Sequence, residues 1–169
     1  AVQYATRMGA RLTNNSWGGG GFSTALYSAI AASRDAGLLF VAAAGNDGSD
    51  IDSAPHYPAS YNLDNVIAVA ATDHQDSLAN FSNFGAKTVD LAAPGVDTTS
   101  TIPGGTYARS SGTSMASPHV AGVAALAWSV KPSATYQEIR DAMLQSVDAI
   151  PSLKNLTASG GRLNAHQTL

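Results

Sequence analysis

Ser114 and Asn46 are two polar residues at the ends of apolar segments, where they could act together. Ser114 opens a long Ala-rich apolar segment directly after Gly112 and Thr113, so it would lie in the first turn of a helix. A helix N-terminus offers free backbone N–H groups and positive potential, which favour an oxyanion forming beside that hydroxyl. Asn46 follows the apolar run 38–43, and a carboxamide at the carboxyl end of a buried strand points into the crevice where parallel sheets bind ligands. Ser114 is the candidate nucleophile and Asn46 the candidate donor to the oxyanion.

Each of these residues also has an ordinary structural explanation. Serine is a common helix N-cap, and Asn46 before Asp47-Gly48 is a residue type that tolerates a left-handed turn. Either residue alone would favour the structural explanation. The two together favour catalysis, because packing does not require both.

The segments between and around these two residues alternate between strand and helix patterns. Apolar runs predict strands, and 3.6-residue periodicity predicts helices, the second of them capped by Ser23 and ended by Gly37. The pattern predicts an α/β fold with three layers, a mainly parallel sheet flanked by helices. Helix 114–130 is apolar nearly all round and is predicted to be buried. The predicted strands are 12–15, 38–43, 66–71, 89–92 and the hairpin 98–102 with 106–110, and the predicted helices begin near 2, 24, 114 and 135.

Composition narrows the possible functions. The 169 residues are 44% apolar and 12% charged, with a net charge of −3, which suits a single domain with a substantial core. Nine scattered Lys and Arg residues provide neither a basic surface for nucleic acid nor a polybasic membrane anchor. No apolar run approaches the roughly 18 residues of a membrane span. The absence of cysteine excludes thiol catalysis, zinc–thiolate sites and disulfides.

The string from Ser111 to Gly122, SGTSMASPHVAG, closely resembles the nucleophile motif of the subtilisin-like serine proteases (subtilases, peptidase family S8). Ala42-Ala43-Ala44-Gly45-Asn46 resembles the oxyanion-asparagine motif of the same family. Ala92-Ala93-Pro94-Gly95 and Gly161-Arg162-Leu163-Asn164-Ala165 resemble two further landmarks. The resemblance implies a serine endopeptidase that works through an acyl-enzyme, with a polypeptide substrate, no cofactor in the chemistry and an extracellular location.

The resemblance also implies a set of substrate-binding residues. Asn15-Ser16-Trp17-Gly18-Gly19 resembles the segment along which subtilases bind the substrate backbone as an added strand. Tyr57-Pro58-Ala59 resembles the segment beside the pocket for the residue that precedes the cleaved bond, where the Tyr-Pro peptide is often cis. His56 is expected to line that pocket and to alter its preference. The expected substrate-binding residues are Ser16, Trp17, Gly18, Ala43, Ala44, Gly45, His56 and Thr113.

A cation site is a further implication of the resemblance. Asp90 aligns with a carboxylate that binds calcium or a monovalent cation in some subtilases, where carbonyl groups of the Ala59, Tyr61 and Val66 region would complete the oxygen ligands. The alternative is that Asp90 only caps or turns the chain at a strand end.

The remaining members of a Ser-His-Asp triad are not apparent. Subtilases follow the order Asp, His, Ser, and the strings that carry the first two are absent from residues 1–169. His119 is expected to pack inward, His74 and His166 to lie in polar segments, and His56 to line the pocket. We therefore interpret residues 1–169 as the C-terminal portion of one catalytic domain, inactive alone and completed by the missing N-terminal part.

Two rival hypotheses remain. Ser114, Asp148 and His166 follow the Ser, Asp, His order of the α/β-hydrolases, although Ala116 replaces the second glycine of that family's Gly-x-Ser-x-Gly motif. The other rival is a noncatalytic subtilase-like domain that uses the same fold for binding or scaffolding.

Overall fold

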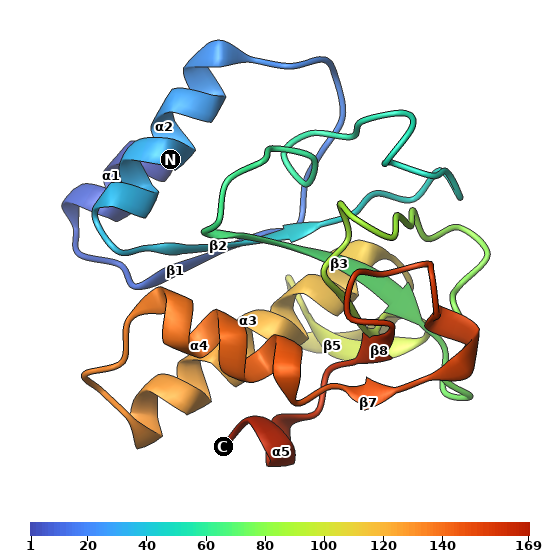
Figure 1. Ribbon diagram of the computed structural model, residues 1–169. Coiled ribbons are helices and arrows are strands. Elements are labelled where there is room, and N and C mark those ends of the chain that lie inside the picture. The colour runs from blue at the N-terminus through green and yellow to red at the C-terminus, as the bar shows by residue number, and fades with distance from the viewer.

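A central sheet separates two layers of helices in the computed structural model, which describes all 169 residues (Figure 1). The helices are α1 (Val2–Arg7), α2 (Thr24–Asp35), α3 (Thr113–Val130), α4 (Tyr136–Gln145) and α5 (Ala165–Thr168), with a 3₁₀ helix at Pro151–Leu153. The strands are β1 (Leu12–Asn15), β2 (Leu39–Ala43), β3 (Val66–Thr72), β4 (Leu91–Pro94), β5 (Thr98–Ile102), β6 (Thr106–Ser110), β7 (Asp148–Ala149) and β8 (Gly161–Arg162).

The main sheet has six strands in the order β1-β2-β3-β4-β8-β7. The first five pair in parallel, and only the short β7 at one edge runs antiparallel to its neighbour. Strands β5 and β6 form a separate antiparallel hairpin. The predicted mainly parallel α/β sheet is confirmed. The largest shift of a predicted strand is that of β4, which begins and ends two residues later than the apolar run at 89–92, while β2 and β3 differ from their predicted ranges by one residue each.

Buried residues of the central strands alternate between two cores, as the twofold side-chain period of a strand requires. Leu39 and Val41 of β2 belong to a 20-residue core beneath α3 and α4. Phe40 and Ala42 belong to a 14-residue core on the opposite face, against which α2 packs. Figure 1 shows α1 and α2 on one side of the sheet and α3 and α4 on the other. The expected three-layer arrangement is therefore present.

Helix α3 differs from the expectation in one respect. One face, with Val120 and Ala124, is fully buried against the sheet. The other carries an exposed stripe, defined here as Pro118, His119, Gly122, Leu126 and Val130, with Leu126 51% and Val130 65% exposed. The prediction that α3 is buried all round, and with it His119, is wrong for this chain, because α1 and α2 cover only the far face of the sheet.

Helix α4 begins with a reciprocal cap that the sequence places at Thr135. The Thr135 hydroxyl accepts a hydrogen bond from the Glu138 N–H, and the Glu138 carboxylate accepts one from the Thr135 N–H at 2.8 Å. Lys131 Nζ also donates to Glu138 at 2.8 Å. Hydrogen bonds from Lys131 and Thr135 lower the pKa of Glu138 to about 2. The two reciprocal hydrogen bonds between Thr135 and Glu138 therefore stabilise the first turn of α4.

Loss of this cap should weaken the fold measurably. Thr135→Ala is expected to lower the free energy of unfolding by about 1 kcal/mol, because the Glu138 N–H loses its acceptor. Thr135→Ser keeps the hydroxyl and should recover most of that loss. Urea denaturation of the three proteins measures the difference, and equal stabilities for Thr135→Ala and wild type would contradict it.

Candidate active site

Three chain segments meet at the carboxyl edge of the parallel strands. Strands β1 and β2 pair in register, with Asn15 opposite Ala42, so the residues that follow each strand emerge side by side. Helix α3 begins at the same edge, where the Gly112 N–H donates to the Gly95 carbonyl at 2.8 Å. The sheet therefore brings together residues that are far apart in the sequence.

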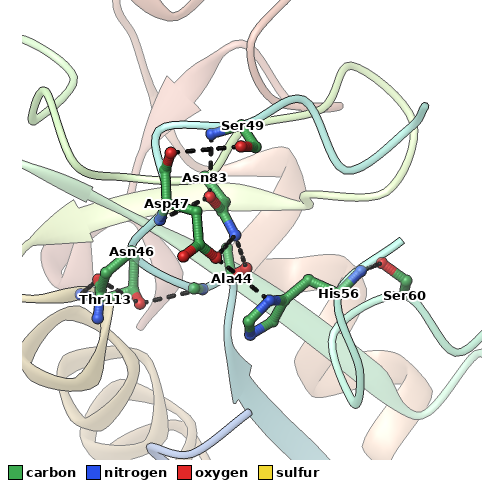
Figure 2. A network of polar contacts seen from close by, with 9 residues as sticks. Ala44, Asn46, Asp47, Ser49, His56, Ser60, Asn83 and Thr113 are labelled. Atoms are coloured by element: carbon green, nitrogen blue, oxygen red, sulfur yellow. Dashed lines mark hydrogen bonds and ion pairs between the residues drawn. The ribbon is translucent and has the colours of Figure 1, made fainter. Parts of the chain in front are cut away.

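Asn46 is held in one orientation by the start of α3 (Figure 2). Its Oδ1 accepts hydrogen bonds from the Thr113 N–H at 2.9 Å and from the Thr113 hydroxyl at 3.0 Å. The Thr113 hydroxyl in turn accepts from the Gly45 N–H at 3.1 Å. Because Oδ1 is engaged by two donors, the NH₂ group of Asn46 faces away from Thr113, and it donates to no other group of the chain.

The free NH₂ group and the Ser114 N–H approach the same place. A Cβ atom on Gly112 would lie 3.6 Å from Asn46 Nδ2 and 3.7 Å from Ser114 N, so both nitrogens border that glycine. The Ser114 N–H is in the first turn of α3, where backbone donors have no helical partner. Two donors next to one serine are what an oxyanion hole requires.

The Ser114 hydroxyl rests against the neighbouring segment. It donates to the Ser16 carbonyl at 3.2 Å, while the Ser16 hydroxyl donates to the Ser114 carbonyl at 2.8 Å. Ser114 is partly exposed, and no histidine forms a hydrogen bond with it. The chain thus presents the nucleophile without a base beside it.

A cleft of about 210 Å³ lies between the segments that follow β1 and β2. Six of the eight expected substrate-binding residues line it together with Ser114 and Asn46: Trp17, Gly18, Ala43, Gly45, His56 and Thr113. Ser16 contacts Ser114 through the two bonds above, and Ala44 is buried with its carbonyl turned toward Asn83. The expected residues therefore gather in one place, and their roles toward substrate stay predictions.

Two residues in this region escaped sequence reasoning. Asn83 is fully buried and fixes the turn after β2, donating to the Ala44 carbonyl at 2.9 Å and accepting from the N–H groups of Asp47 and Ser49 at 3.0 Å each. Asp47 also lines the cleft, with its Oδ2 3.6 Å from His56 Nδ1 (Figure 2). The Asp47 side chain is 68% exposed, and no local sequence pattern marks Asn83 as the support of its backbone.

The other three histidines stand apart from this cleft. His119 is exposed on α3, with Nδ1 2.8 Å from the Met115 carbonyl oxygen. His74 lies in an exposed turn and His166 in the exposed part of α5. Asp148, the carboxylate of the rival hydrolase hypothesis, binds Arg162 at 2.8 Å and Asn164 at 2.8 Å. Neither Asp148 nor His166 contacts Ser114, so that hypothesis has no triad.

The predicted cation ligands line a second cavity, of about 460 Å³. Ala59, Tyr61, Val66 and Asp90 all border it, together with Arg140. One Asp90 oxygen accepts from Arg140 at 2.7 Å and the other from the Ala68 N–H at 2.8 Å. Burial raises the pKa of the Asp90 carboxyl, and Arg140 and the Ala68 N–H oppose that rise.

The donor set at Asp90 fits a metal ion poorly. A guanidinium already faces the single carboxylate that the resemblance assigns to the site, and no cluster of three or more His, Asp or Glu side chains in the chain could hold a metal ion. The sequence did not reveal Arg140, which comes from α4. The calcium or monovalent cation site stays a prediction. The guanidinium group of Arg140 would compete with a metal ion for the Asp90 carboxylate.

Comparison with known proteins identifies the class of this fold and site. Residues 1–166 match the subtilase family, peptidase S8, and the chain belongs to that family. It is 47% identical over 169 residues to a thermophilic serine proteinase of Bacillus sp. (strain AK1) and 44% identical over 168 residues to thermitase of Thermoactinomyces vulgaris. These alignments cover 100% and 99% of this chain but 40% and 57% of the two relatives, so the chain spans about half their length.

Solved structures show the same fold. The prenylagaramide maturation protease PagA superposes with a TM-score of 0.87 at 34% identity, over 99% of this chain and 64% of that protein. The S218A mutant of the protease domain of PatA superposes with a TM-score of 0.84 at 36% identity, over 99% of this chain and 61% of that one. The expected subtilisin-like fold is confirmed.

Removal of the Arg140 guanidinium should show how strongly the Asp90 carboxylate depends on a positively charged partner. Arg140→Gln is expected to lower the free energy of unfolding by about 3 kcal/mol, because it leaves a buried carboxylate without its ion pair. Added Ca²⁺ or K⁺ should raise the melting temperature of this variant and leave that of the wild type nearly unchanged. A matched Asp90→Asn/Arg140→Gln protein should not respond to either cation. A wild-type stabilisation by cations that Asp90→Asn abolishes would instead establish the predicted site.

Proposed function

We propose that this chain is part of a serine endopeptidase that hydrolyses peptide bonds through an acyl-enzyme. The observation that supports it is the convergence of Asn46 Nδ2 and the Ser114 N–H beside the Ser114 hydroxyl. Ser114 Oγ attacks the scissile carbonyl carbon, and its proton passes to a general base. The carbonyl oxygen, which gains negative charge, accepts hydrogen bonds from Asn46 and from the Ser114 N–H. The protonated amine leaves, and water then hydrolyses the ester.

We further propose that the base and its orienting carboxylate come from polypeptide outside residues 1–169. The lack of a histidine bonded to Ser114 and the greater length of the relatives support this assignment. A second hollow, of about 290 Å³, also borders Ser114, and its other lining residues are Thr98, Thr99, Ser100, Met115, Pro118 and His119. This hollow would let a base reach the serine hydroxyl.

Two adjacent surfaces would receive the same polypeptide. Strand β1 pairs only with β2, which leaves the backbone groups of its outer edge without a strand partner. The exposed stripe of α3 lies next to it, because Ser117 on α3 donates to Asn14 Oδ1 on β1 at 2.7 Å. An added strand and a helix would cover this edge and stripe, and soluble proteins rarely leave such apolar faces open.

Neither nucleic acid nor a membrane is part of the proposal. None of the helices combines the length and the hydrophobicity that a bilayer-spanning segment requires. The substrate is a polypeptide, and the proposed location is extracellular, on the basis of the family. A noncatalytic subtilase-like domain is the competing hypothesis, and the lack of a base within these residues is the observation that favours it.

The roles of the site residues can be tested in the complete protein that contains this chain. Ser114→Ala should abolish casein hydrolysis and labelling by a fluorophosphonate. Asn46→Ala should lower kcat by about 10²- to 10³-fold with a smaller change in KM, because the lost donor acts on the transition state. Thr113→Val should lower kcat by about tenfold by freeing the Asn46 carboxamide, and Thr113→Ser should restore it. Unchanged kcat in Asn46→Ala would remove Asn46 from the chemistry.

The chain alone should be almost inert toward the same reagent. Without a base, fluorophosphonate labelling of Ser114 in residues 1–169 is expected to be at least about 10⁴-fold slower than in the complete protein. Circular dichroism checks that the chain is folded, and addition of the separately produced remainder should restore labelling. Rapid stoichiometric labelling of the chain alone would contradict the proposal that the general base lies outside residues 1–169. A complete protein that is never labelled would favour the noncatalytic domain.

A further inference from the structure

The imidazole ring of His56 is wedged between two glycines at the floor of the substrate cleft. A Cβ on Gly18 would lie 2.5 Å from His56 Nε2, and a Cβ on Gly45 would lie 2.9 Å from the same atom. Both values are shorter than real Cβ contacts, so a side chain at either position would displace the ring. The His56 side chain is 18% exposed and lines the cleft with Ser114 and Asn46. Any side chain that enters between these walls meets the ring.

The two ring nitrogens differ in what surrounds them. Nδ1 faces the Asp47 carboxylate at 3.6 Å, an arrangement that favours a proton on Nδ1. Nε2 forms no hydrogen bond and keeps some exposed surface, and the residue that carries it lines the cleft. An accessible, unpaired ring nitrogen at the bottom of a narrow cleft is a group that a ligand can satisfy.

The surroundings hold this arrangement in place. The His56 N–H donates to the Ser60 hydroxyl at 2.9 Å (Figure 2), and the Gly19 N–H donates to the Tyr57 carbonyl at 2.9 Å, which joins the Gly18 wall to the segment that carries His56. The Asp47 N–H is fixed by Asn83 at 3.0 Å. The ring and its carboxylate therefore sit on supported backbone rather than on a mobile loop tip.

We propose that His56 selects substrates whose residue before the cleaved bond (P1) carries a carboxamide, glutamine or asparagine, through a hydrogen bond to Nε2. This inference rests on the proposed endopeptidase function and deepens it. With Nδ1 protonated toward Asp47, Nε2 is an acceptor, and the carboxamide NH₂ is its donor. An aliphatic P1 side chain would bury Nε2 without a partner, which a site built for hydrogen bonding rejects.

The test uses the complete protein and peptides that differ only at P1. The values of kcat/KM are measured for the glutamine and leucine substrates at pH 8, and their ratio cancels every contribution that does not depend on P1. The glutamine value should exceed the leucine value by about tenfold.

Matched variants separate hydrogen bonding from shape. His56→Phe keeps a planar ring without nitrogens and should reverse the glutamine preference. His74→Phe makes the same replacement in an exposed turn and should behave as wild type.

Several results would overturn the inference. They are a wild-type preference for leucine over glutamine, or a glutamine preference that survives His56→Phe. If Ser114 is never labelled and no peptide is cleaved, the endopeptidase proposal itself has failed. In that case the ring nitrogen resonances of His56 can still be followed by NMR while product peptides ending in glutamine or leucine are added. Tighter binding of the glutamine peptide, with a shift at Nε2, would support the pocket assignment, and equal binding would reject it.

Discussion

The hydrogen bonds between Thr113 and Asn46 are the contact on which the candidate site depends. They connect the end of β2 to the start of α3, and they do so with both donors of Thr113 directed at one amide oxygen. The Gly45 N–H completes the cycle through the Thr113 hydroxyl. If this cycle opened, the sheet and helix could remain packed while the carboxamide rotated away from Ser114. A few hydrogen bonds therefore set the geometry that a large apolar core only approximates.

Much of the fold follows from local sequence because its elements satisfy local rules. The apolar runs that became β2 and β3 are buried on both faces, as parallel strands are, and their length excluded helices. Ser23 caps α2 through the Leu26 N–H, and the hairpin turns at Pro103-Gly104-Gly105 as the alternating pattern required. The exposed stripe of α3 was not predictable from the sequence. The hydrophobicity of a helix face shows that the face can be buried, but it does not show which segment of the protein covers it.

The parts of the site that sequence reasoning missed are supplied by distant residues. Arg140 reaches Asp90 from α4, fifty positions away, and Asn83 reaches the turn after β2 from a loop without regular structure. Neither residue belongs to a short motif, since each acts through long-range geometry that only the folded chain creates. Ser114 and Asn46 were found because each belongs to a string whose chemistry and local structure coincide.

The groups proposed to act in catalysis and in substrate selection share one turn in this molecule. Residues 44–49 carry the carboxamide of Asn46 on one side and the carboxylate of Asp47 on the other, and Asn83 anchors the backbone between them. Asn46 points to the start of α3 while Asp47 points to His56 (Figure 2). Because one buried side chain supports both, a substitution at Asn83 would disturb the oxyanion donor and the pocket together. The His56 ring approaches this turn at Asp47 and Gly45, and it forms no hydrogen bond with Asn46. On the proposed roles, selectivity would vary with the residue at position 56 while the hydrogen bonds from Thr113 to Asn46 are retained.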